Sequence, residues 1–311
     1  MKKLWILTLI LCTSLPHFAQ YTDIINSKRP GNSESPYSVG TDVLQIEGGV
    51  FFGQSDSDDT WAIVDPVGIS TFIRYSKFME RLEVNANITY ASSKLQFNNI
   101  FKSYRNISGI SELTVGAKYL IYQQEYADKS KEIRSWKKRT EFDKKRLIPS
   151  VAAYVGLNTN FLSEGYKMEK ISPKAAILLQ NDFTDRTVVL TNLIADYIGT
   201  ERSVYSYIIT LTHALNMQWS VFVENQGDFY GFKSEFEFGA GAAYLYSPDL
   251  QLDVALRGNF SQVDSGFTAG LGASYRFDWH EDQMIEVDEN GQKAKKKEGG
   301  FFSKLFKKKK K

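Results

Sequence analysis

Cysteine and histidine are scarce in this chain of 311 residues, which contains one cysteine and three histidines. The cysteine, Cys12, lies in an N-terminal segment that we expect to be removed, so the mature chain would have no disulfide, no thiol nucleophile and no cysteine-based metal site. His213 and His280 would remain, but neither belongs to a metal-ligand spacing or to a grouping with a serine and an orienting polar residue. A Gly-rich phosphate-binding loop is also lacking. We therefore predict that the protein is not an enzyme and has no catalytic residue, no cofactor and no metal site.

Long apolar runs are lacking as well. A transmembrane helix needs about 20 apolar residues, and the run at residues 4–11 is too short to be one. This run follows two lysines and precedes a small residue, Ala19, which is the pattern of a secretory signal peptide over residues 1–19. Lipoprotein cleavage before Cys12 is the alternative, although the leucine before it is bulky for that cleavage site.

Alternation of apolar and polar residues is what the chain has in abundance. Within residues 250–260, Leu252 and Leu256 fall on one face of a strand and Asp253 on the other. An even number of strands of about ten residues, apolar outside and polar inside, predicts an all-β transmembrane antiparallel up-and-down barrel over residues 43–278. Twelve such segments are present: 43–54, 62–76, 82–92, 110–123, 147–159, 173–182, 187–198, 203–214, 218–226, 234–246, 250–260 and 267–278.

Aromatic residues make up 14% of the chain, and many lie at the ends of these segments. Aromatic girdles at the two membrane interfaces have this distribution. A soluble β-sandwich also alternates, but it would not need a dozen strands closed by an aromatic-ended last strand. We therefore expect the outer membrane of a diderm bacterium, with its lipid as the surrounding partner.

The predicted connections alternate in length. We expect tight periplasmic turns at 78–81, 183–186, 215–217 and 247–249, and longer external loops at 91–109, 161–171 and 227–233. Because successive connections alternate between the two ends of the barrel, the connection 124–146 should be periplasmic, yet it is long and rich in Lys and Arg. It could be a helical insertion, or the strand parity could be wrong there. Near residue 57, Asp56, Asp58 and Asp59 lack the glycine and distal glutamate of a calcium loop and are interpreted as an external loop tip.

The last strand carries a more specific pattern. Gly272, Tyr275 and Phe277 form a Gly-x-x-Tyr-x-Phe sequence. It resembles the C-terminal signal by which the barrel-assembly machinery recognises outer-membrane proteins, so we expect that machinery as a partner during biogenesis. The signal usually ends the chain, whereas a tail follows it here.

Several stretches resemble a single family. They are the opening with Arg29, Pro30 and Glu34, followed by Gln45 and Glu47, and further pieces at 72–84, 115–119, 222–224, 241–253 and 270–277. In this order they resemble the outer-membrane transporter family named for the MetA pathway of phenol degradation. The resemblance spans residues 24–278 and implies an outer-membrane barrel classed as a transporter. It does not imply a phenol substrate, because a fold does not settle function.

The charged residues that match the family fall mainly on the polar face of the strands, where they would point into the lumen. Opposite charges in a small barrel usually pair and fix the structure; the alternative is a charged permeation path or ligand site. We expect Arg74 to share a network with Glu47 or Glu224. The candidate set is Glu47, Arg74, Glu83, Lys118, Glu224, Glu237, Asp253, Arg257 and Arg276.

Two segments flank the predicted barrel. Residues 20–42, with Arg29, Pro30 and Glu34, could form an ordered plug in the lumen or a solvated periplasmic leader. Residues 279–311 form a basic tail, since residues 293–311 hold ten Lys and one Glu. The tail could rest on an anionic leaflet, dock on a periplasmic or membrane-protein partner, or remain solvated and flexible. Nucleic acid is not expected as a partner in this compartment.

Two functional hypotheses follow. The first is a channel or transporter for small molecules that could be hydrophobic or aromatic. The second is a non-transporting barrel that serves as a structural or accessory subunit of an outer-membrane complex. Conductance through a planar bilayer separates them.

Overall fold

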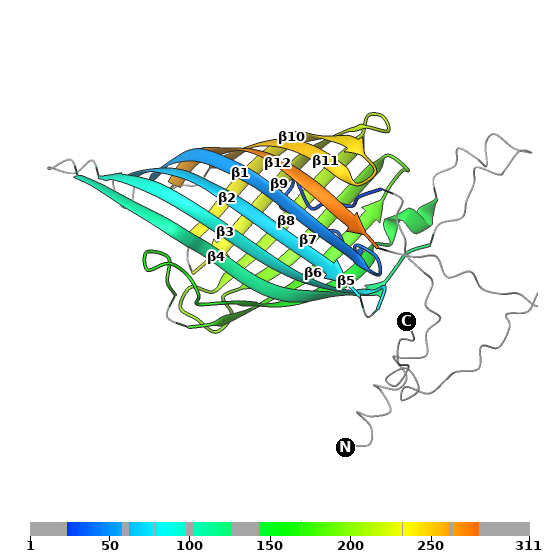
Figure 1. Ribbon diagram of the computed structural model, residues 1–311, viewed down its shortest axis with the longest axis horizontal. Helices are drawn as coiled ribbons and strands as arrows, with labels where there is room; N and C mark the ends of the chain where they lie inside the picture. Colours follow the sequence, from blue (N-terminus) through cyan, green and yellow to red (C-terminus); the bar gives the residue numbers. More distant parts are fainter. Residues whose placement is uncertain are drawn as a thin grey trace, which may run out of the picture. The chain divides into compact units, whose positions relative to one another are not determined.

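The computed structural model is a closed barrel of twelve antiparallel strands, as predicted (Figure 1). The strands are β1 (Val43–Ser57), β2 (Ala62–Ser76), β3 (Leu82–Phe97), β4 (Ser103–Tyr122), β5 (Ser150–Asn158), β6 (Ser172–Asp182), β7 (Thr187–Asp196), β8 (Val204–Ala214), β9 (Trp219–Tyr230), β10 (Lys233–Ser247), β11 (Leu250–Phe260) and β12 (Asp264–Asp278).

The structure describes residues 24–57, 62–77, 79–97, 103–125, 143–168, 170–231, 233–260 and 264–279. The predicted signal peptide, the tail after Trp279, His280, and the acidic residues Asp58 and Asp59 lie outside these residues. No helix in the described part of the chain combines the length and apolar character of a membrane span.

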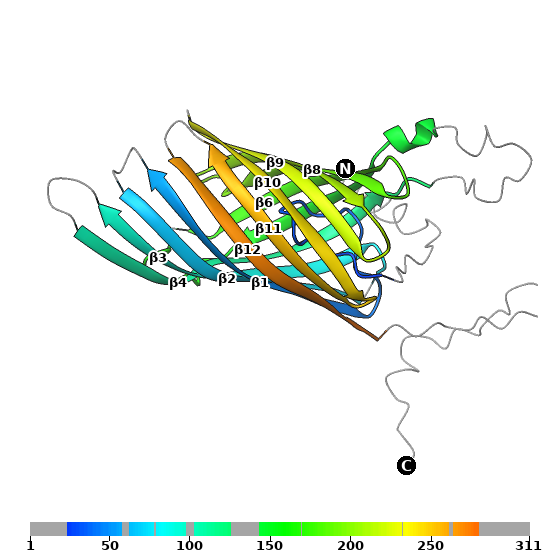
Figure 2. The ribbon, with the colours of Figure 1, turned by 90° about the horizontal axis from the view of Figure 1, so that it is seen from above.

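Each strand pairs with its sequence neighbours, and the last strand pairs with the first. The β1–β12 register runs from Val43 opposite Asp278 to Ser57 opposite Asp264. Figure 2 shows these two strands side by side. An up-and-down barrel closed in this way leaves no unpaired sheet edge along the seam, which is the condition for a β-structure in lipid.

The two faces of the wall differ as the alternation predicts. On β11, Leu252, Val254 and Leu256 are exposed on the outer surface, whereas Asp253 and Ala255 are buried inside. The same division holds on β1, β3, β4 and β12. A soluble protein buries its large aliphatic residues, so an outer surface covered with exposed Leu, Val, Ile and Phe excludes the soluble sandwich and fits a lipid-facing wall.

Several strands are longer than predicted, and two of the predicted loops are wrong. Most of 91–109 continues β3 and β4, which remain paired up to Phe97 and Ser103. Most of 227–233 continues β9 and β10, paired up to Tyr230 and Lys233. The first four residues of β4 are all exposed, so this part of the hairpin has no apolar face to bury. The apolar alternation therefore predicts the part of each strand that faces lipid, but it does not predict where the strand ends.

The turns 77–81, 183–186, 215–218 and 248–249 lie at one end of the barrel, which we call the turn end; the opposite end is the loop end. The long connection after β4 also falls at the turn end, so the strand parity was right. Its described part includes a short 3₁₀ helix, η2 (Lys144–Leu147). The Arg146 Nη2 atom of η2 lies 2.6 Å from Asp185 Oδ1, which fixes η2 against the β6–β7 turn. Residues 126–142, where a helical insertion was considered, lie outside the described residues.

Candidate functional site in the barrel lumen

The chain before β1 runs inside the barrel at its turn end. Residues 25–39, which we call the inner segment, have no regular secondary structure, and Figure 2 shows their dark-blue trace between the strands. Ser33, Glu34, Pro36 and Val39 are buried there. A segment without helix or sheet must satisfy its backbone groups by other partners when it is buried, and the lumen side chains supply these partners.

Glu47 of β1 binds the start of the inner segment. Its Oε2 atom accepts hydrogen bonds from the Ser27 hydroxyl at 2.9 Å, the Lys28 N–H at 3.0 Å and the Arg29 N–H at 3.2 Å. Its Oε1 atom accepts from the side-chain amide of Gln45 at 2.7 Å. One carboxylate thus replaces the partners that a strand or helix would have given to these backbone groups.

Arg74 of β2 lies between two carboxylates. Its guanidinium reaches Glu47 Oε1 at 3.3 Å and both oxygens of Glu83 at 2.9 Å. The same group donates to the backbone carbonyls of Asn26 at 2.6 Å and Tyr37 at 3.3 Å. The Arg74 side chain is 1% exposed, so all of its charge is balanced inside the protein.

Lys118 of β4 extends this group to the middle of the inner segment. Its Nζ atom lies 2.9 Å from Glu34 Oε1, 3.3 Å from Glu83 Oε1 and 2.9 Å from the carbonyl of Ser35. Glu83 Oε2 also accepts from the Val39 N–H at 3.0 Å. The two wall cations and the wall carboxylate therefore hold both backbone and side-chain groups of the inner segment.

Arg29 makes its main side-chain contact on the other side of β1, with β11. Its guanidinium donates to both oxygens of Asp253, at 3.0 and 3.3 Å. It lies flat over Gly49 and Gly272, where an added Cβ would come within 2.3 Å of guanidinium nitrogens. These two glycines therefore provide the space in which Arg29 lies.

Glu224 and Arg257 hold the next turn of the inner segment. Glu224 accepts from the Asn32 N–H at 2.9 Å and from Thr210 Oγ1 at 2.7 Å. Arg257 donates to the carbonyl of Pro30 at 2.6 Å. Its Nε atom lies 3.6 Å from Glu224 and 3.5 Å from Glu237.

Other predicted residues lie elsewhere. Arg276 pairs with Asp249 at the turn end, 2.8 Å apart. Tyr275 and Phe277 point outward and stack edge to face at 4.7 Å. His213 lies near the turn end of β8, with its Nδ1 atom 2.9 Å from Thr187 Oγ1.

An apolar patch inside the lumen was missed by the sequence reading. Leu120, Ala152, Tyr154, Ala176 and Leu178, from β4, β5 and β6, form one buried cluster, and Tyr37 and Ile194 pack against it. Period-two alternation cannot reveal such a patch, because strands that are apolar on both faces show no alternation. The signal in the sequence was the pair of unbroken apolar runs at residues 151–157 on β5 and 175–179 on β6.

A cavity of about 380 Å³ lies beside the inner segment. Its polar lining includes Lys28, Glu112, Lys174 and Asp196, and its apolar lining includes Phe72 together with residues of the β5–β8 wall. The Lys28 ammonium lies 5.0 Å from the centre of the Phe72 ring, a cation–π contact. The apolar side of this wall comprises Tyr154, Ala176, Leu178, Ile194, Val204 and Ile208.

The surroundings of Glu34, in the inner segment, lower the pKa of its carboxyl group. Burial acts to raise its pKa, but the positive charges of Lys118, Lys28 and Arg74 outweigh burial and bring the pKa below its ordinary value of 4.5. A carboxylate with a depressed pKa stabilises the docked state at every pH above its unbound pKa, and this contribution is lost as the pH falls through the docked value.

We therefore expect Glu34→Gln to weaken docking of the inner segment at neutral pH and to matter progressively less as the pH falls below about 4.5. Hydrogen exchange of peptides from residues 25–39, corrected for the intrinsic pH dependence of exchange, measures this. If the difference in exchange rate between variant and parent is the same at pH 7 and at pH 3, the charged form of Glu34 does not stabilise docking.

Comparison with protein families gives a match over residues 27–277 to the family described as "Putative MetA-pathway of phenol degradation". The chain belongs to this family. The resemblance stated from the sequence is thus confirmed. Comparison with curated proteins gives no match.

Two solved structures are similar to the chain at low sequence identity. A crystal structure of an outer membrane channel from Pseudomonas putida F1 superposes with a TM-score of 0.58 and 9% identity, covering 81% of this chain and 100% of that one. The translocator domain of the autotransporter NalP from Neisseria meningitidis gives a TM-score of 0.46 and 12% identity, covering 76% and 89%. The first similarity supports the fold. Together with the apolar outer surface and charged interior, it identifies the chain as an outer-membrane β-barrel.

Proposed function

We propose that the barrel is a channel for small molecules with an apolar part, and that the inner segment is its closing element. The observation that carries this proposal is the cavity of about 380 Å³, whose lining combines apolar side chains of β5–β8 with charged groups and which lies beside the inner segment. Because tight turns in such barrels face the periplasm, we place the turn end on that side and the large cavity toward the exterior.

A second cavity, of about 160 Å³, supports the role of the inner segment. It is lined by residues 25–31 and 33 of the inner segment and, from the wall, by Thr212 and Ser220 close to the turn end. Lys28 lines both cavities. Displacement of the segment between them would join the two spaces into one path.

The composition of the large cavity favours a particular class of solute. Its apolar wall would accept an aromatic or alicyclic ring, while Lys28, Asn192 and Asp196 could bind polar substituents. The description of the family refers to phenol degradation, and a small aromatic compound with a polar substituent has the required character.

A reversible disulfide between the inner segment and the barrel wall tests the proposal. The hydroxyls of Ser27 on the inner segment and Ser274 on β12 are 2.7 Å apart, so Ser27→Cys with Ser274→Cys should place two thiols at disulfide distance. After oxidation we expect no opening events in a planar bilayer, because the segment cannot leave the wall. Dithiothreitol should restore the conductance of the parent protein.

Each single-cysteine variant, treated with the same oxidant, is the control. Equal conductance in the oxidised and reduced double variant would show that the inner segment does not close the path. A parent protein without conductance or uptake of small aromatic solutes, in either state, would favour the alternative of an accessory barrel. The well-satisfied charges around the inner segment are compatible with that alternative.

A further inference from the structure

A basic pocket lies at the loop end of the barrel, beside the lumen cavity, with which it shares Tyr197. It has a volume of about 270 Å³ and is formed by the β5–β6 connection and the β7–β8 connection. Among the described residues, its lining brings together three cationic side chains, Lys167, Lys170 and Arg202, with one carboxylate, Glu201. The hydroxyl-bearing residues Tyr197, Ser172 and Thr200 complete its polar lining.

The cations of this pocket are available for a ligand. Within the described part of the chain, no carboxylate lies at ion-pair distance from Lys167, Lys170 or Arg202; the nearest recorded partner of Arg202 is the sulfur of Met168 at 3.5 Å. By contrast, carboxylates pair with the lumen-facing cations Arg29, Arg74, Lys118, Lys174 and Arg257. A concave site in which the described cations outnumber the described carboxylate favours an anion with several acceptor oxygens, for which Lys and Arg are the usual partners.

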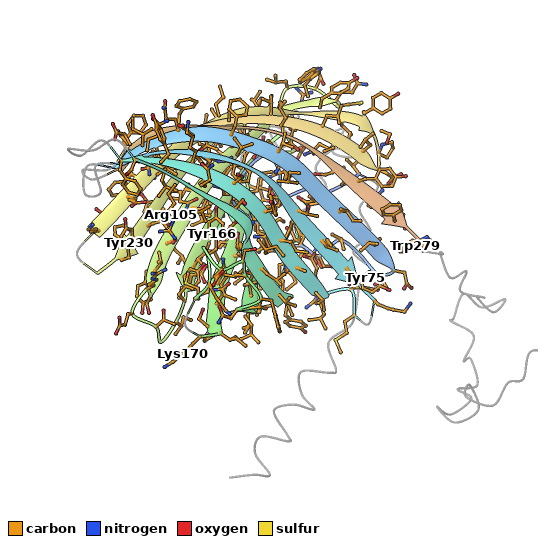
Figure 3. All side chains as sticks on the ribbon, turned by 60° about the vertical axis from the view of Figure 1, so that its left-hand side comes forward. Tyr75, Arg105, Tyr166, Lys170, Tyr230 and Trp279 are labelled. Carbon is orange, nitrogen blue, oxygen red and sulfur yellow. The ribbon has the colours of Figure 1, made fainter. Side chains whose placement is uncertain are left out.

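The pocket also lies at the edge of the lipid-facing surface. Ile171, between the lining residues Lys170 and Ser172, is 59% exposed, and Ile198, between Tyr197 and Gly199, is also exposed. The two connections are joined by a hydrogen bond from the Ile198 N–H to the Pro173 carbonyl, 3.1 Å long. Figure 3 shows Lys170 at the margin of the barrel, far from Tyr75 at the turn end.

Exposed isoleucines directly beside clustered cations are typical of the membrane interface, where the acyl chains end and the charged headgroups begin. We propose that this pocket binds the phosphate group of an outer-leaflet lipid. The apolar side chains contact the acyl region, and Lys167, Lys170 and Arg202 bind the phosphate oxygens. The proposal does not rest on the proposed channel function: none of the three cations lines the lumen cavity, although Tyr197 lines both spaces.

The test measures binding of lipid A to the full chain in neutral detergent, by native mass spectrometry and by titration. The variant is Lys170→Gln with Arg202→Gln, and the matched control is Arg105→Gln, which removes an exposed charge at the loop end outside the pocket. We expect the double variant to lose at least about tenfold in affinity, as for loss of charge-assisted hydrogen bonds, and the control to bind like the parent. Heat-modifiable gel migration shows that all three proteins are folded.

Two further probes decide the source of the anion. Lipid A lacking its phosphates should bind the parent as weakly as lipid A binds the double variant, and inorganic phosphate alone should bind only weakly. Equal binding of phosphorylated and dephosphorylated lipid would overturn the proposal. So would tight, pocket-dependent binding of inorganic phosphate without binding of the lipid, which would indicate a site for a soluble anion.

Discussion

Arg74→Ala is expected to lower the free energy of unfolding of the barrel by about 3–5 kcal/mol, the usual cost of removing one partner from a buried ion pair. Arg74 is almost fully buried, and the side chains of its partners Glu47 and Glu83 have no exposed surface. Without the guanidinium, Glu47 loses its ion pair, and Glu83 keeps only the one with Lys118, which it shares with Glu34. The backbone carbonyls of Asn26 and Tyr37 also lose a donor.

Urea titration of the protein in liposomes, followed by heat-modifiable gel migration, measures this loss. Arg74→Lys keeps the charge but not the two-pronged contact with Glu83, so its effect should be intermediate. Arg105→Ala removes an exposed arginine and should leave stability within about 0.5 kcal/mol of the parent. An Arg74→Ala protein that folds and unfolds like the parent would mean that these charges do not stabilise the barrel.

The strands and their faces could be predicted because one physical rule governs both. A strand between lipid and a polar lumen must alternate, so the positions of Leu256 and Asp253 on β11 follow from the sequence alone. Alternation is lost where a strand does not lie between lipid and a polar lumen. The ends of β3 and β4 leave the apolar layer, and β5 and β6 face an apolar patch of the lumen, so neither has an alternation to read.

The candidate charges could be placed on the inner face, but their partners could only partly be predicted. Arg74 and Glu83 lie on adjacent strands of one hairpin, where a short turn brings them together. The contact of Lys118 with Glu34 joins β4 to a segment 84 residues earlier that has no periodicity. The path of that segment depends on acceptors contributed by Glu47, Glu83, Glu224 and Asp253 from four separate strands, and only the closed barrel brings these together.

Gly272→Val should release the inner segment from the wall without preventing assembly of the barrel. A Cβ at Gly272 would come within 2.3 Å of the Arg29 guanidinium, so Arg29 must leave its contact with both oxygens of Asp253. Loss of a charge-assisted contact of this kind costs about 1.5–3 kcal/mol, which corresponds to roughly a tenfold or larger rise in the released population. Under the proposed function, this rise appears as more frequent or longer openings in a planar bilayer.

Gly270→Val is the matched control, because it lies two residues earlier on β12, where the nearest atom to an added Cβ is the Val50 carbonyl oxygen at 3.5 Å. It should assemble and conduct like the parent. The comparison also separates two roles for Gly272, which belongs to the predicted assembly signal with Tyr275 and Phe277. If Gly272 serves recognition by the assembly machinery, Gly272→Val lowers the yield of folded barrel in cells but refolds normally in detergent. If it provides the space for Arg29, the yield is normal and the change lies in the conductance and in the hydrogen exchange of residues 25–39, because the guanidinium has lost the flat surface on which it binds Asp253.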